Sequence, residues 1–257
     1  MSEKSDSISL FFPVYKDEET VRVMVDKALR LLTSLDAPFE IVIVDDGSPD
    51  RSGAIADELA RQHPEIRVIH HERNLGYGAA VRSGLAACRH DVVCMTDGDD
   101  EYEVEDFRKL LKLRDRYELV ITFRYKKIYS STRIFVSWVY NVVLRFLFRT
   151  SFRDVSTGLR LARRSVLEEL DLRATSPFIG AEIAIKTMLK GYRVGEVGIQ
   201  TFPRAFGSGS STSLPNILAT MRDMWRIYHQ VFSDSYDLPA GRGRLSSEAA
   251  SRDGSRR

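Results

Sequence analysis

Two hydrophobic patterns alternate along the first half of the chain. Short runs in which nearly every residue is apolar predict buried strands, whereas segments with apolar residues every three or four positions predict helices. Strands that alternate with helices are typical of parallel β-α-β units, so we expect an α/β sheet flanked by helices. The predicted strands are residues 8–15, 40–44, 66–70, 92–95 and 119–123, and the predicted helices of this half are residues 18–35, 52–62 and 74–88.

Charged or turn-forming residues stand at the ends of three of these strands. They are Pro13-Val14-Tyr15, Asp45-Asp46-Gly47-Ser48 and Asp97-Gly98-Asp99. Because ligands of parallel sheets bind beyond the carboxyl ends of the strands, we expect these segments to form one site. A divalent cation relieves the repulsion between clustered carboxylates, and Mg²⁺ takes one or two of them beside water and phosphate oxygens. A solvated acidic turn is the alternative for Asp97 and Asp99, and the agreement of three strand ends favours the site.

A glycine-rich segment, Asn74-Leu75-Gly76-Tyr77-Gly78, opens the third predicted helix. It does not match a dinucleotide-binding fingerprint, because Val81 occupies the third small position and the segment does not follow the first strand. The sequence also contains no Gly-x-x-x-x-Gly-Lys-Ser/Thr, which argues against a P-loop enzyme. Either a loop that closes over a nucleotide or a plain turn at a helix start explains the glycines.

The second half contains an unusual predicted helix at residues 132–148. Arg133, Ser137, Asn141 and Arg145 recur every fourth residue and form one polar stripe on a helix that is otherwise apolar all round. Such a helix is buried, or lies at a membrane surface with its aromatic residues among the headgroups. Arginine binds phosphate through two parallel hydrogen bonds, so the stripe favours a phosphate ligand over a stripe that only faces water. Further helices are predicted at residues 181–189 and 217–232.

The composition limits the class of protein. With 257 residues, 43% of them hydrophobic, the chain can bury one large domain, expected over residues 1–232, and the polar stretch 233–257 is expected to be disordered. A net charge of +2 provides no field that would attract nucleic acid. Two cysteines, and five histidines without an H-E-x-x-H sequence, give neither a disulfide framework nor a zinc site, which fits a reducing cytosol. The sequence shows no signal peptide and no apolar run of the roughly 20 residues that span a bilayer.

Four motifs, in order and spacing, resemble glycosyltransferase family 2 over residues 8–212. They are Phe12-Pro13-Val14-Tyr15, Val44-Asp45-Asp46-Gly47-Ser48, Asn74-Leu75-Gly76 and Thr96-Asp97-Gly98-Asp99. The resemblance implies an inverting transferase of the GT-A fold, a Rossmann-like nucleotide-diphospho-sugar transferase fold whose mostly parallel sheet is flanked by helices. It divides the domain into a nucleotide-binding half, residues 8–117, and an acceptor half, residues 118–232. Lys16-Asp17 departs from the family's usual Asn-Glu.

The resemblance also implies which residues bind the donor. A UDP- or GDP-linked sugar is expected to carry Mg²⁺ or Mn²⁺ on its diphosphate, where the metal neutralises charge on the leaving group. Asp99 is expected to be the more direct metal ligand and Asp97 to lie nearer the nucleotide, while Glu101 stands where glutamine is common. The implied nucleotide-binding residues are Pro13, Val14, Tyr15, Asp17, Asp45, Asp46, Gly76 and Asp97, and the implied metal ligands are Asp97, Asp99 and Glu101.

Arg124, the stripe on residues 133–141 and the segment 154–160 resemble the branch of the family that glycosylates polyprenyl phosphate, which includes dolichyl-phosphate mannose synthase. The resemblance implies a metal-dependent hexosyltransferase of cell envelope biosynthesis, peripheral at the cytoplasmic face of the cell membrane. A homo-oligomer or a membrane-protein partner stays open. Arg204-Ala205-Phe206-Gly207 resembles the start of a closing loop, Arg-x-x-Gly-x-Ser-Lys, whose lysine is missing here. The implied acceptor-phosphate residues are Arg124, Arg133, Ser137, Asn141 and Arg204, and the implied catalytic residues are Asp99, Arg124 and Arg133.

A family 2 enzyme that glycosylates a hydroxyl of a glycan or small molecule is the alternative. A hydroxyl acceptor needs a general base, for which Glu182 and Asp154 are the candidates. Glu182 also fits a favourable charge in the first turn of a helix. A lipid phosphate is already anionic, so its enzyme mainly has to position two anions against their repulsion. Because the sequence has no Gln-x-x-Arg-Trp, a processive polysaccharide synthase is disfavoured.

Overall fold

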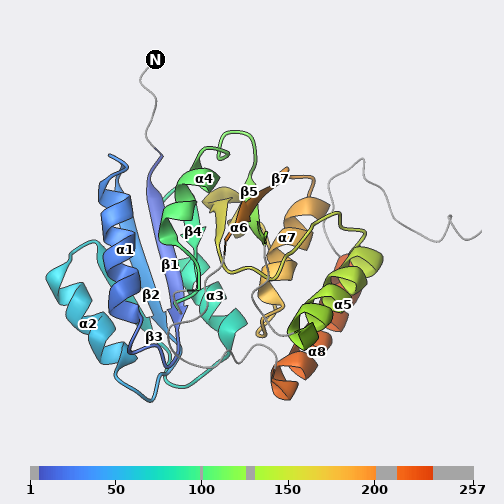
Figure 1. Ribbon diagram of the computed structural model, residues 1–257, viewed down its shortest axis with the longest axis horizontal. Helices are drawn as coiled ribbons and strands as arrows, with labels where there is room; N and C mark the ends of the chain where they lie inside the picture. The colour runs from blue at the N-terminus through green and yellow to red at the C-terminus, as the bar shows by residue number, and fades with distance from the viewer. Residues whose placement is uncertain (1–5, 99–100, 126–130, 201–212, 234–257) are drawn as a thin grey trace, which may run out of the picture.

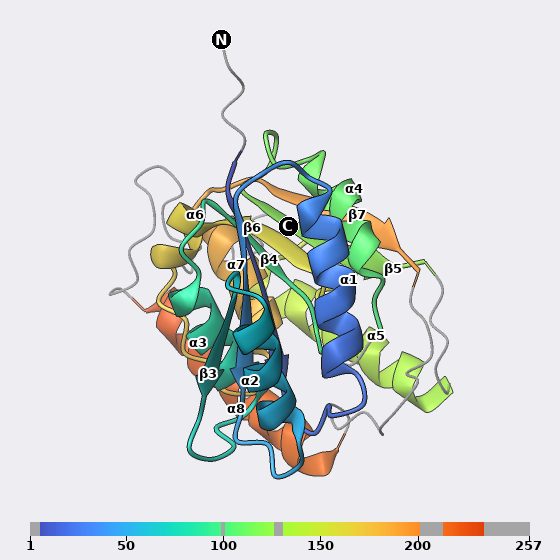
Figure 2. The same cartoon turned by 90° about the vertical axis from the view of Figure 1, so that its left-hand side faces the viewer.

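One sheet runs through the centre of the molecule, and helices cover both of its faces (Figure 1, Figure 2). The computed structural model describes residues 6–98, 101–125, 131–200 and 213–233, with the backbone alone for residues 131–133. The strands of the sheet lie in the order β3-β2-β1-β4-β6-β5-β7. They are β1 (Ile8–Val14), β2 (Phe39–Asp45), β3 (Ile66–His70), β4 (Val92–Met95), β5 (Leu119–Arg124), β6 (Arg160–Arg163) and β7 (Val194–Ile199).

The register of the sheet explains how distant segments meet. The strands β1, β2 and β4 are parallel neighbours, so their carboxyl ends meet at one edge, as predicted. The short strand β6 runs antiparallel to both β4 and β5. Arg160, at the start of β6, pairs with Met95, at the end of β4. The residues before Arg160 therefore lie beside the residues after Met95, and the second half of the chain reaches the segment of Asp97.

Successive side chains along the strands point to opposite faces of the sheet and pack in two hydrophobic core layers. In β1, Ile8, Leu10, Phe12 and Val14 pack on the side of α1, α2 and α4, whereas Phe11 packs on the side of α3, α5, α7 and α8. The helices are α1 (Val21–Thr33), α2 (Ser52–Gln62), α3 (Tyr77–Ala87), α4 (Phe107–Leu111), α5 (Ser131–Phe148), α6 (Arg164–Glu168), α7 (Ile179–Leu189) and α8 (Leu214–Phe232), with a 3₁₀ turn η1 (Val104–Asp106).

The predicted elements are confirmed, and their ends differ where local hydrogen bonds decide. The helix predicted over residues 18–35 begins at Val21, because the amides of Thr20 and Val21 both donate to the Asp17 carbonyl oxygen and form a turn first. The strands β6 and β7 were not predicted. The predicted tail at residues 233–257 falls, apart from Ser233, outside the described residues.

Candidate functional site

The carboxyl ends of β1 and β4 lie against each other. A Cβ atom on Gly98 would lie 2.9 Å from the Pro13 carbonyl oxygen, so only glycine fits this approach. Thr20 Oγ1 donates to the Gly98 carbonyl oxygen at 2.7 Å, which fixes the end of β4 to the turn before α1. In that turn the Asp17 carboxylate accepts from the Tyr15 amide at 2.9 Å. These contacts hold the ends of β1 and β4 together at the base of the candidate site, called the floor below.

Of the predicted nucleotide-binding residues in this floor, Tyr15 is exposed and Asp17 is half-buried, whereas Pro13 and Val14 are buried. Val14 packs in the core, so a nucleotide could contact only its backbone. Lys16 has a φ of 61°, the left-handed conformation of a tight turn. Contacts from Tyr15 and Asp17 to a nucleotide stay a prediction.

Asp45 is buried at the end of β2 and supports the turn that follows. Its carboxylate accepts from the Ser48 amide at 2.9 Å and lies 2.9 Å from His70 Nδ1. The other ring nitrogen of His70 lies 3.1 Å from Asp57 Oδ1. Burial alone would lower the pKa of His70, but the hydrogen bonds to the two carboxylates outweigh burial and raise it. Asp45 therefore supports the turn after β2 through buried hydrogen bonds.

Asp46 holds the glycine-rich segment. Its carboxylate accepts from the amides of Leu75 at 2.9 Å and Gly76 at 3.0 Å, and His71 Nδ1 lies 2.7 Å from it. Gly76 has a φ of +95° and directly precedes α3, so the turn at a helix start describes its position. Whether the segment also closes over a nucleotide stays a prediction, in which Asp46 acts as its support.

Asp97, directly beyond the end of β4, is held from two sides. The Tyr77 hydroxyl, from the first residue of α3, donates to Asp97 Oδ1 at 2.6 Å. Burial raises the pKa of Tyr77 well above its usual value, and the charge of Asp97 acts in the same direction, so Tyr77 stays a proton donor. On the other side a Cβ atom on Gly158 would lie 2.1 Å from Asp97 Oδ2. The carboxylate thus has one orientation, set by residues from both halves of the chain.

Arg160 places a buried guanidinium behind Asp97. Its nitrogens donate to the carbonyl oxygens of Thr157 at 2.9 Å, Val155 at 2.6 Å and Gly180. Burial lowers the pKa of Arg160, and the nearby Tyr77 and Asp97 oppose that effect. An arginine keeps its charge in proteins, so a positive charge backs the Asp97 segment.

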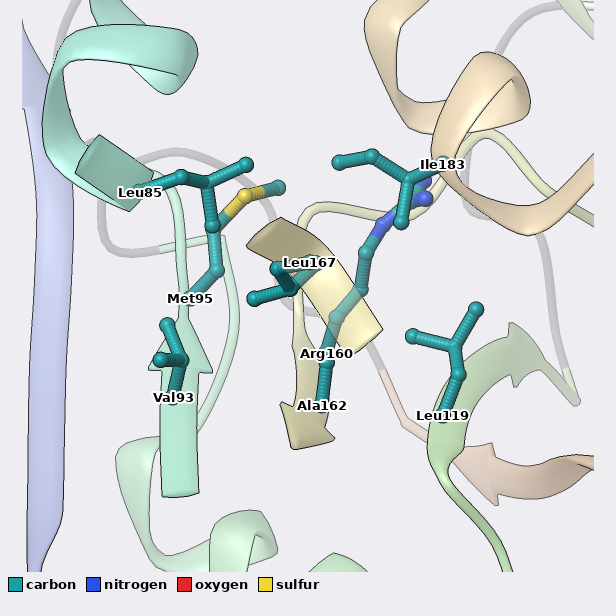
Figure 3. A pocket seen from close by; sticks show the side chains of 8 residues that line it. All are labelled: Leu85, Val93, Met95, Leu119, Arg160, Ala162, Leu167 and Ile183. Carbon is teal, nitrogen blue, oxygen red and sulfur yellow. The ribbon is translucent and has the colours of Figure 1, made fainter. Parts of the chain in front are cut away.

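The stem of Arg160 lines a small cavity between the sheet and α7 (Figure 3). The other side chains around this cavity are apolar, and the guanidinium turns towards Ile183 of α7. A cavity with this lining offers little to a nucleotide diphosphate, so the strand ends are the better candidate for the donor site. The side chains that line the cavity are Leu85, Val93, Met95, Leu119, Arg160, Ala162, Leu167 and Ile183.

Glu101 follows Asp97 as a second carboxylate beyond the end of β4. It is 3% exposed, and both carboxylates lie close enough to the buried Tyr102 to add to the rise that burial causes in its pKa. Carboxylate oxygens are the ligands that Mg²⁺ prefers, and it needs only one or two of them besides water and phosphate. In the described part of the chain no group of three His, Cys, Asp or Glu side chains could hold a metal, and Asp99 lies outside it. Each of these carboxylates is a ligand type that suits such an ion, and a metal shared by Asp97 and Glu101 stays a prediction.

Arg124, at the end of β5, forms a buried ion pair with Asp154. Its Nε and Nη2 lie 3.1 and 2.8 Å from Asp154 Oδ2, and Nη2 donates to Ser156 Oγ at 2.5 Å. Burial alone would lower the pKa of Arg124, but the charge of Asp154 outweighs it and raises the pKa. The pair ties β5 to the segment that contacts Asp97.

The predicted stripe on α5 meets the same segment at one point. Asn141 is 5% exposed, and its side chain accepts from the Val155 amide at 3.3 Å and donates to the Ser137 carbonyl oxygen at 2.8 Å. Ser137 itself is half-buried. The structure thus brings together Arg124, Asn141 and Asp154, whereas the side chain of Arg133 and the whole of Arg204 lie outside the described residues.

Glu182, the other candidate base, is fully buried on α7. Its carboxylate accepts from the amides of Arg173 at 2.9 Å and Ala174 at 2.8 Å, and from Lys186 Nζ at 2.6 Å. Since Asp154 is likewise paired, neither carboxylate is poised to take a proton from a hydroxyl. This geometry gives the prediction of a general base no support.

The helices α5 and α8 lie on one side of the molecule (Figure 1), and both expose large apolar side chains. They meet where Phe148 packs against Tyr228 and Phe232, with ring centroids 5.9 and 6.2 Å apart (Figure 1). Within the described residues no helix is long and apolar enough to cross a bilayer. The exposed apolar residues are Phe135, Trp138, Val142 and Phe146 on α5 and Leu214, Leu218, Met221 and Trp225 on α8.

Sequence reasoning missed three residues of the site, namely Tyr77, Gly158 and Arg160. Tyr77 stands between two glycines of a quoted motif, and the other two belong to the segment 154–160. The sequence therefore marked the two segments that contain these residues, but not their contacts with Asp97. The contacts with Asp97 depend on the pairing of β4 with β6, which the sequence pattern did not indicate.

Comparisons with known proteins bear on the family and the fold of this chain. The model of the family described as glycosyl transferase family 2 matches residues 9–171. Polyprenol monophosphomannose synthase of Mycolicibacterium smegmatis is 29% identical over 211 residues, which cover 77% of this chain and 78% of the relative. Undecaprenyl-phosphate 4-deoxy-4-formamido-L-arabinose transferase of Yersinia enterocolitica is 28% identical over 227 residues, 87% of this chain and 68% of the relative.

Among solved structures, glucosyl-3-phosphoglycerate synthase from Mycobacterium tuberculosis in complex with Mn²⁺, uridine-diphosphate and glucosyl-3-phosphoglycerate has the same fold. Its TM-score is 0.67 at 19% identity, with 88% of this chain and 79% of that chain covered. The predicted α/β fold of GT-A type, with its mostly parallel sheet, is confirmed by this likeness and by the strand pairings.

Proposed function

The chain belongs to glycosyl transferase family 2, and from that premise we propose that it transfers a sugar from a nucleotide-diphosphate donor to polyprenyl phosphate. The proposal places the enzyme at the cytoplasmic face of the cell membrane. Two relatives whose names include a polyprenol or an undecaprenyl phosphate support it, and they cover most of this chain.

The observation that carries the proposal is the contact between Asp97 and the segment 154–160. Gly158 lies against Asp97 Oδ2, and two residues earlier Ser156 accepts from Arg124. A carboxylate suited to a donor and an arginine suited to an acceptor phosphate thus belong to one connected unit. Two anions that must react need such a unit, because their repulsion has to be overcome by position and charge.

The chemistry follows from an anionic acceptor. A phosphate oxygen of the acceptor attacks the anomeric carbon from the face opposite the nucleoside diphosphate, so the new carbon–oxygen bond forms as the old one breaks. No proton has to be removed from the nucleophile, which agrees with the engaged carboxylates of Asp154 and Glu182. Arg133 would hold the acceptor phosphate, and Arg124, which is buried and paired with Asp154, would add its positive charge from behind. Tyr15, Asp17 and the Gly76 segment would hold the nucleoside.

The proposed divalent cation, Mg²⁺ or Mn²⁺, would be held by Asp97, Asp99 and Glu101. Bound there, it would neutralise the charge of the departing diphosphate. Residues of this chain also position Asp97 without the metal. Tyr77 and Gly158 fix the orientation of its carboxylate, and Arg160 places a positive charge behind it.

The exposed faces of α5 and α8 supply the proposed contact with the membrane. Phe135, Trp138 and Trp225 are 62%, 57% and 65% exposed. Exposed aromatic residues of this kind favour the headgroup region of a bilayer. Asn141 connects α5 to the segment 154–160, so a helix resting on the lipid would lie close to the site that receives the phosphate.

Product analysis tests the proposal. The protein is incubated with labelled UDP- and GDP-linked sugars and Mg²⁺ or Mn²⁺, together with polyprenyl phosphate, with polyprenol, or with neither lipid. We expect label in the organic extract only with polyprenyl phosphate. Equal transfer to polyprenol, or transfer only to a water-soluble acceptor, would contradict the proposed acceptor and favour the hydroxyl alternative.

Two arginines on α5 provide a matched pair for the acceptor site. Arg133→Ala should abolish transfer to polyprenyl phosphate but leave slow hydrolysis of the donor, because the donor half is untouched. Arg145→Ala removes the same charge from the exposed far end of the stripe, three turns along the helix, and should lower transfer much less than Arg133→Ala. Equal loss in both variants would show that the helix needs positive charge in general rather than Arg133.

A further inference from the structure

Two buried carboxylates hold one short loop, residues 173–176, by four consecutive backbone amides. Glu182 of α7 accepts from the amides of Arg173 and Ala174, and Asp223 of α8 accepts from those of Thr175 and Ser176, both at 2.9 Å. Both carboxylates are fully buried. Burying a charge is costly unless hydrogen bonds compensate it, so this loop is held far more firmly than an ordinary connection.

Asp223 has a second anchor that reaches the same loop. Arg226 Nη2 lies 3.2 Å from Asp223 Oδ1 and also donates to the Arg173 carbonyl oxygen. The inner side of α8 therefore fastens the loop, while Met221 and Trp225 of the same helix are exposed.

The loop presses directly on the glycine-rich segment before α3. The Gly78 amide donates to the Thr175 carbonyl oxygen at 2.9 Å. A Cβ atom would lie 2.6 Å from the Ala174 carbonyl oxygen if placed on Gly78, and 2.7 Å from that of Thr175 if placed on Gly76. Both glycines that flank Tyr77 are thus fixed against the loop by backbone contacts, so the position of the loop determines the position of Tyr77.

We propose that Tyr77 is a positioning residue for the donor, which orients Asp97 through its hydroxyl, and that Asp223 fixes Tyr77 in place through the loop of residues 173–176. The inference rests on the donor half of the proposed function and deepens it. The hydroxyl holds one carboxylate oxygen at 2.6 Å while Gly158 limits the other. Asp97 therefore meets the donor in one orientation, set from α8.

The test measures nucleotide binding, so that activity is not the only readout. UDP and GDP, each with Mn²⁺, are titrated calorimetrically into the wild type and into Tyr77→Phe, which removes one oxygen atom. We expect the Kd of the better nucleotide to rise about tenfold, as for the loss of a hydrogen bond to a charged group. The donor KM should rise in parallel and the KM for polyprenyl phosphate should not. An unchanged Kd in Tyr77→Phe would overturn the inference.

Tyr192→Phe is the matched control, because it also removes a hydrogen bond from a half-buried tyrosine to a carboxylate, that of Glu169 at 2.8 Å, outside the site. It should bind nucleotide like the wild type. Equal weakening in both variants would reduce the role of Tyr77 to general stability and overturn the inference.

Asp223 is tested by a conservative pair. Asp223→Asn keeps an oxygen that can accept from both amides and should bind nucleotide nearly normally, whereas Asp223→Ala should weaken binding in the same direction as Tyr77→Phe. Both residues act on the carboxylate of Asp97, so their effects on the Kd should not multiply. The double variant Tyr77→Phe/Asp223→Ala should therefore bind nucleotide more tightly than the product of the two single increases in Kd predicts. If the two increases in Kd multiply fully in the double variant, the link through the loop is overturned. Nucleotide binding by Asp223→Asn that is as weak as that by Asp223→Ala would overturn it as well.

The inference and the proposed function fail differently. Normal nucleotide binding without transfer to polyprenyl phosphate would contradict the proposed acceptor and leave the role of Tyr77 standing. A wild type that binds neither UDP nor GDP with Mn²⁺ would contradict the proposed donor, and the inference with it.

Discussion

Replacing Gly158 by alanine should displace Asp97 from its place in the site. The new Cβ atom would lie 2.1 Å from Asp97 Oδ2 and 2.4 Å from the carboxylate carbon. A close carbon–oxygen contact is about 3.3 Å, so the carboxylate has to move by about 1 Å. It cannot turn aside freely, because the Tyr77 hydroxyl holds its other oxygen at 2.6 Å.

A shift of this size predicts a loss of activity in a protein that remains folded. A misplacement of about 1 Å can lower the rate about a hundredfold, which corresponds to about 2.7 kcal/mol of activation free energy. Overpacking of a buried position typically costs about 1–3 kcal/mol of unfolding free energy, so Gly158→Ala should still fold. We therefore expect kcat/KM for transfer to polyprenyl phosphate to fall about a hundredfold while the far-ultraviolet circular dichroism stays native.

Gly195→Ala is the control for overpacking alone. A Cβ atom on Gly195 would lie 2.7 Å from the ring of Tyr117, near the amino end of β7 and therefore at the opposite edge of the sheet from Asp97. Urea unfolding of both variants gives their stabilities, and initial transfer rates give their activities. The reasoning is refuted if Gly158→Ala keeps wild-type kcat/KM, or loses no more than Gly195→Ala at comparable stability.

Further perturbations test separate parts of the structure. Asp154→Ala leaves Arg124 buried without its ion-pair partner, which should lower the unfolding free energy in urea by about 3–5 kcal/mol, and a loss below about 1 kcal/mol would contradict the pairing. His70 has a raised pKa in the folded state, so its contribution to stability is fully present below its unfolded pKa of about 6.5 and is lost as the pH rises through the folded value. The difference in unfolding free energy between the wild type and His70→Gln should thus be larger at about pH 5.5 than at about pH 9. A pH-independent difference would contradict the raised pKa of His70. Phe146→Ser changes a side chain that is 84% exposed and should weaken binding to anionic vesicles about tenfold without changing stability, whereas unchanged binding would exclude this face from the membrane contact. Asp99→Ala should abolish metal-dependent turnover with native circular dichroism, and full activity of that variant in chelator would eliminate the metal role.

The hydrophobic pattern predicted the first four strands well because parallel strands covered on both faces must be nearly all apolar. The same rule did not find β6, which reads Arg-Leu-Ala-Arg, or β7, which contains two glycines and a glutamate. Their places come from tertiary pairing with β4 and β5. Arg160 can lie inside the sheet because backbone carbonyl groups, which no periodicity reveals, satisfy its guanidinium.

For the site, motif spacing located the residues but not their partners. Asp97 was singled out because it follows a strand and Arg124 through the resemblance to the family, and both lie at strand ends of the sheet. The hydrogen bond from Tyr77 to Asp97 and the contacts of Asp223 join residues that are 20 and 47 or 48 positions apart, and only the folded chain brings them together. Glu182 shows the converse, since a helix-start acid that suits a general base is occupied in the fold by backbone amides and a lysine.

The most direct test of the proposed function is the chemical structure of the lipid product. The wild type is incubated with polyprenyl phosphate and the nucleotide sugar that it uses, and the product is analysed by mass spectrometry and phosphorus NMR. We predict the mass of polyprenyl phosphate plus one sugar, a phosphodiester signal, and an anomeric configuration inverted relative to the donor. A product with the sugar on a hydroxyl, or with the donor configuration retained, would contradict the account.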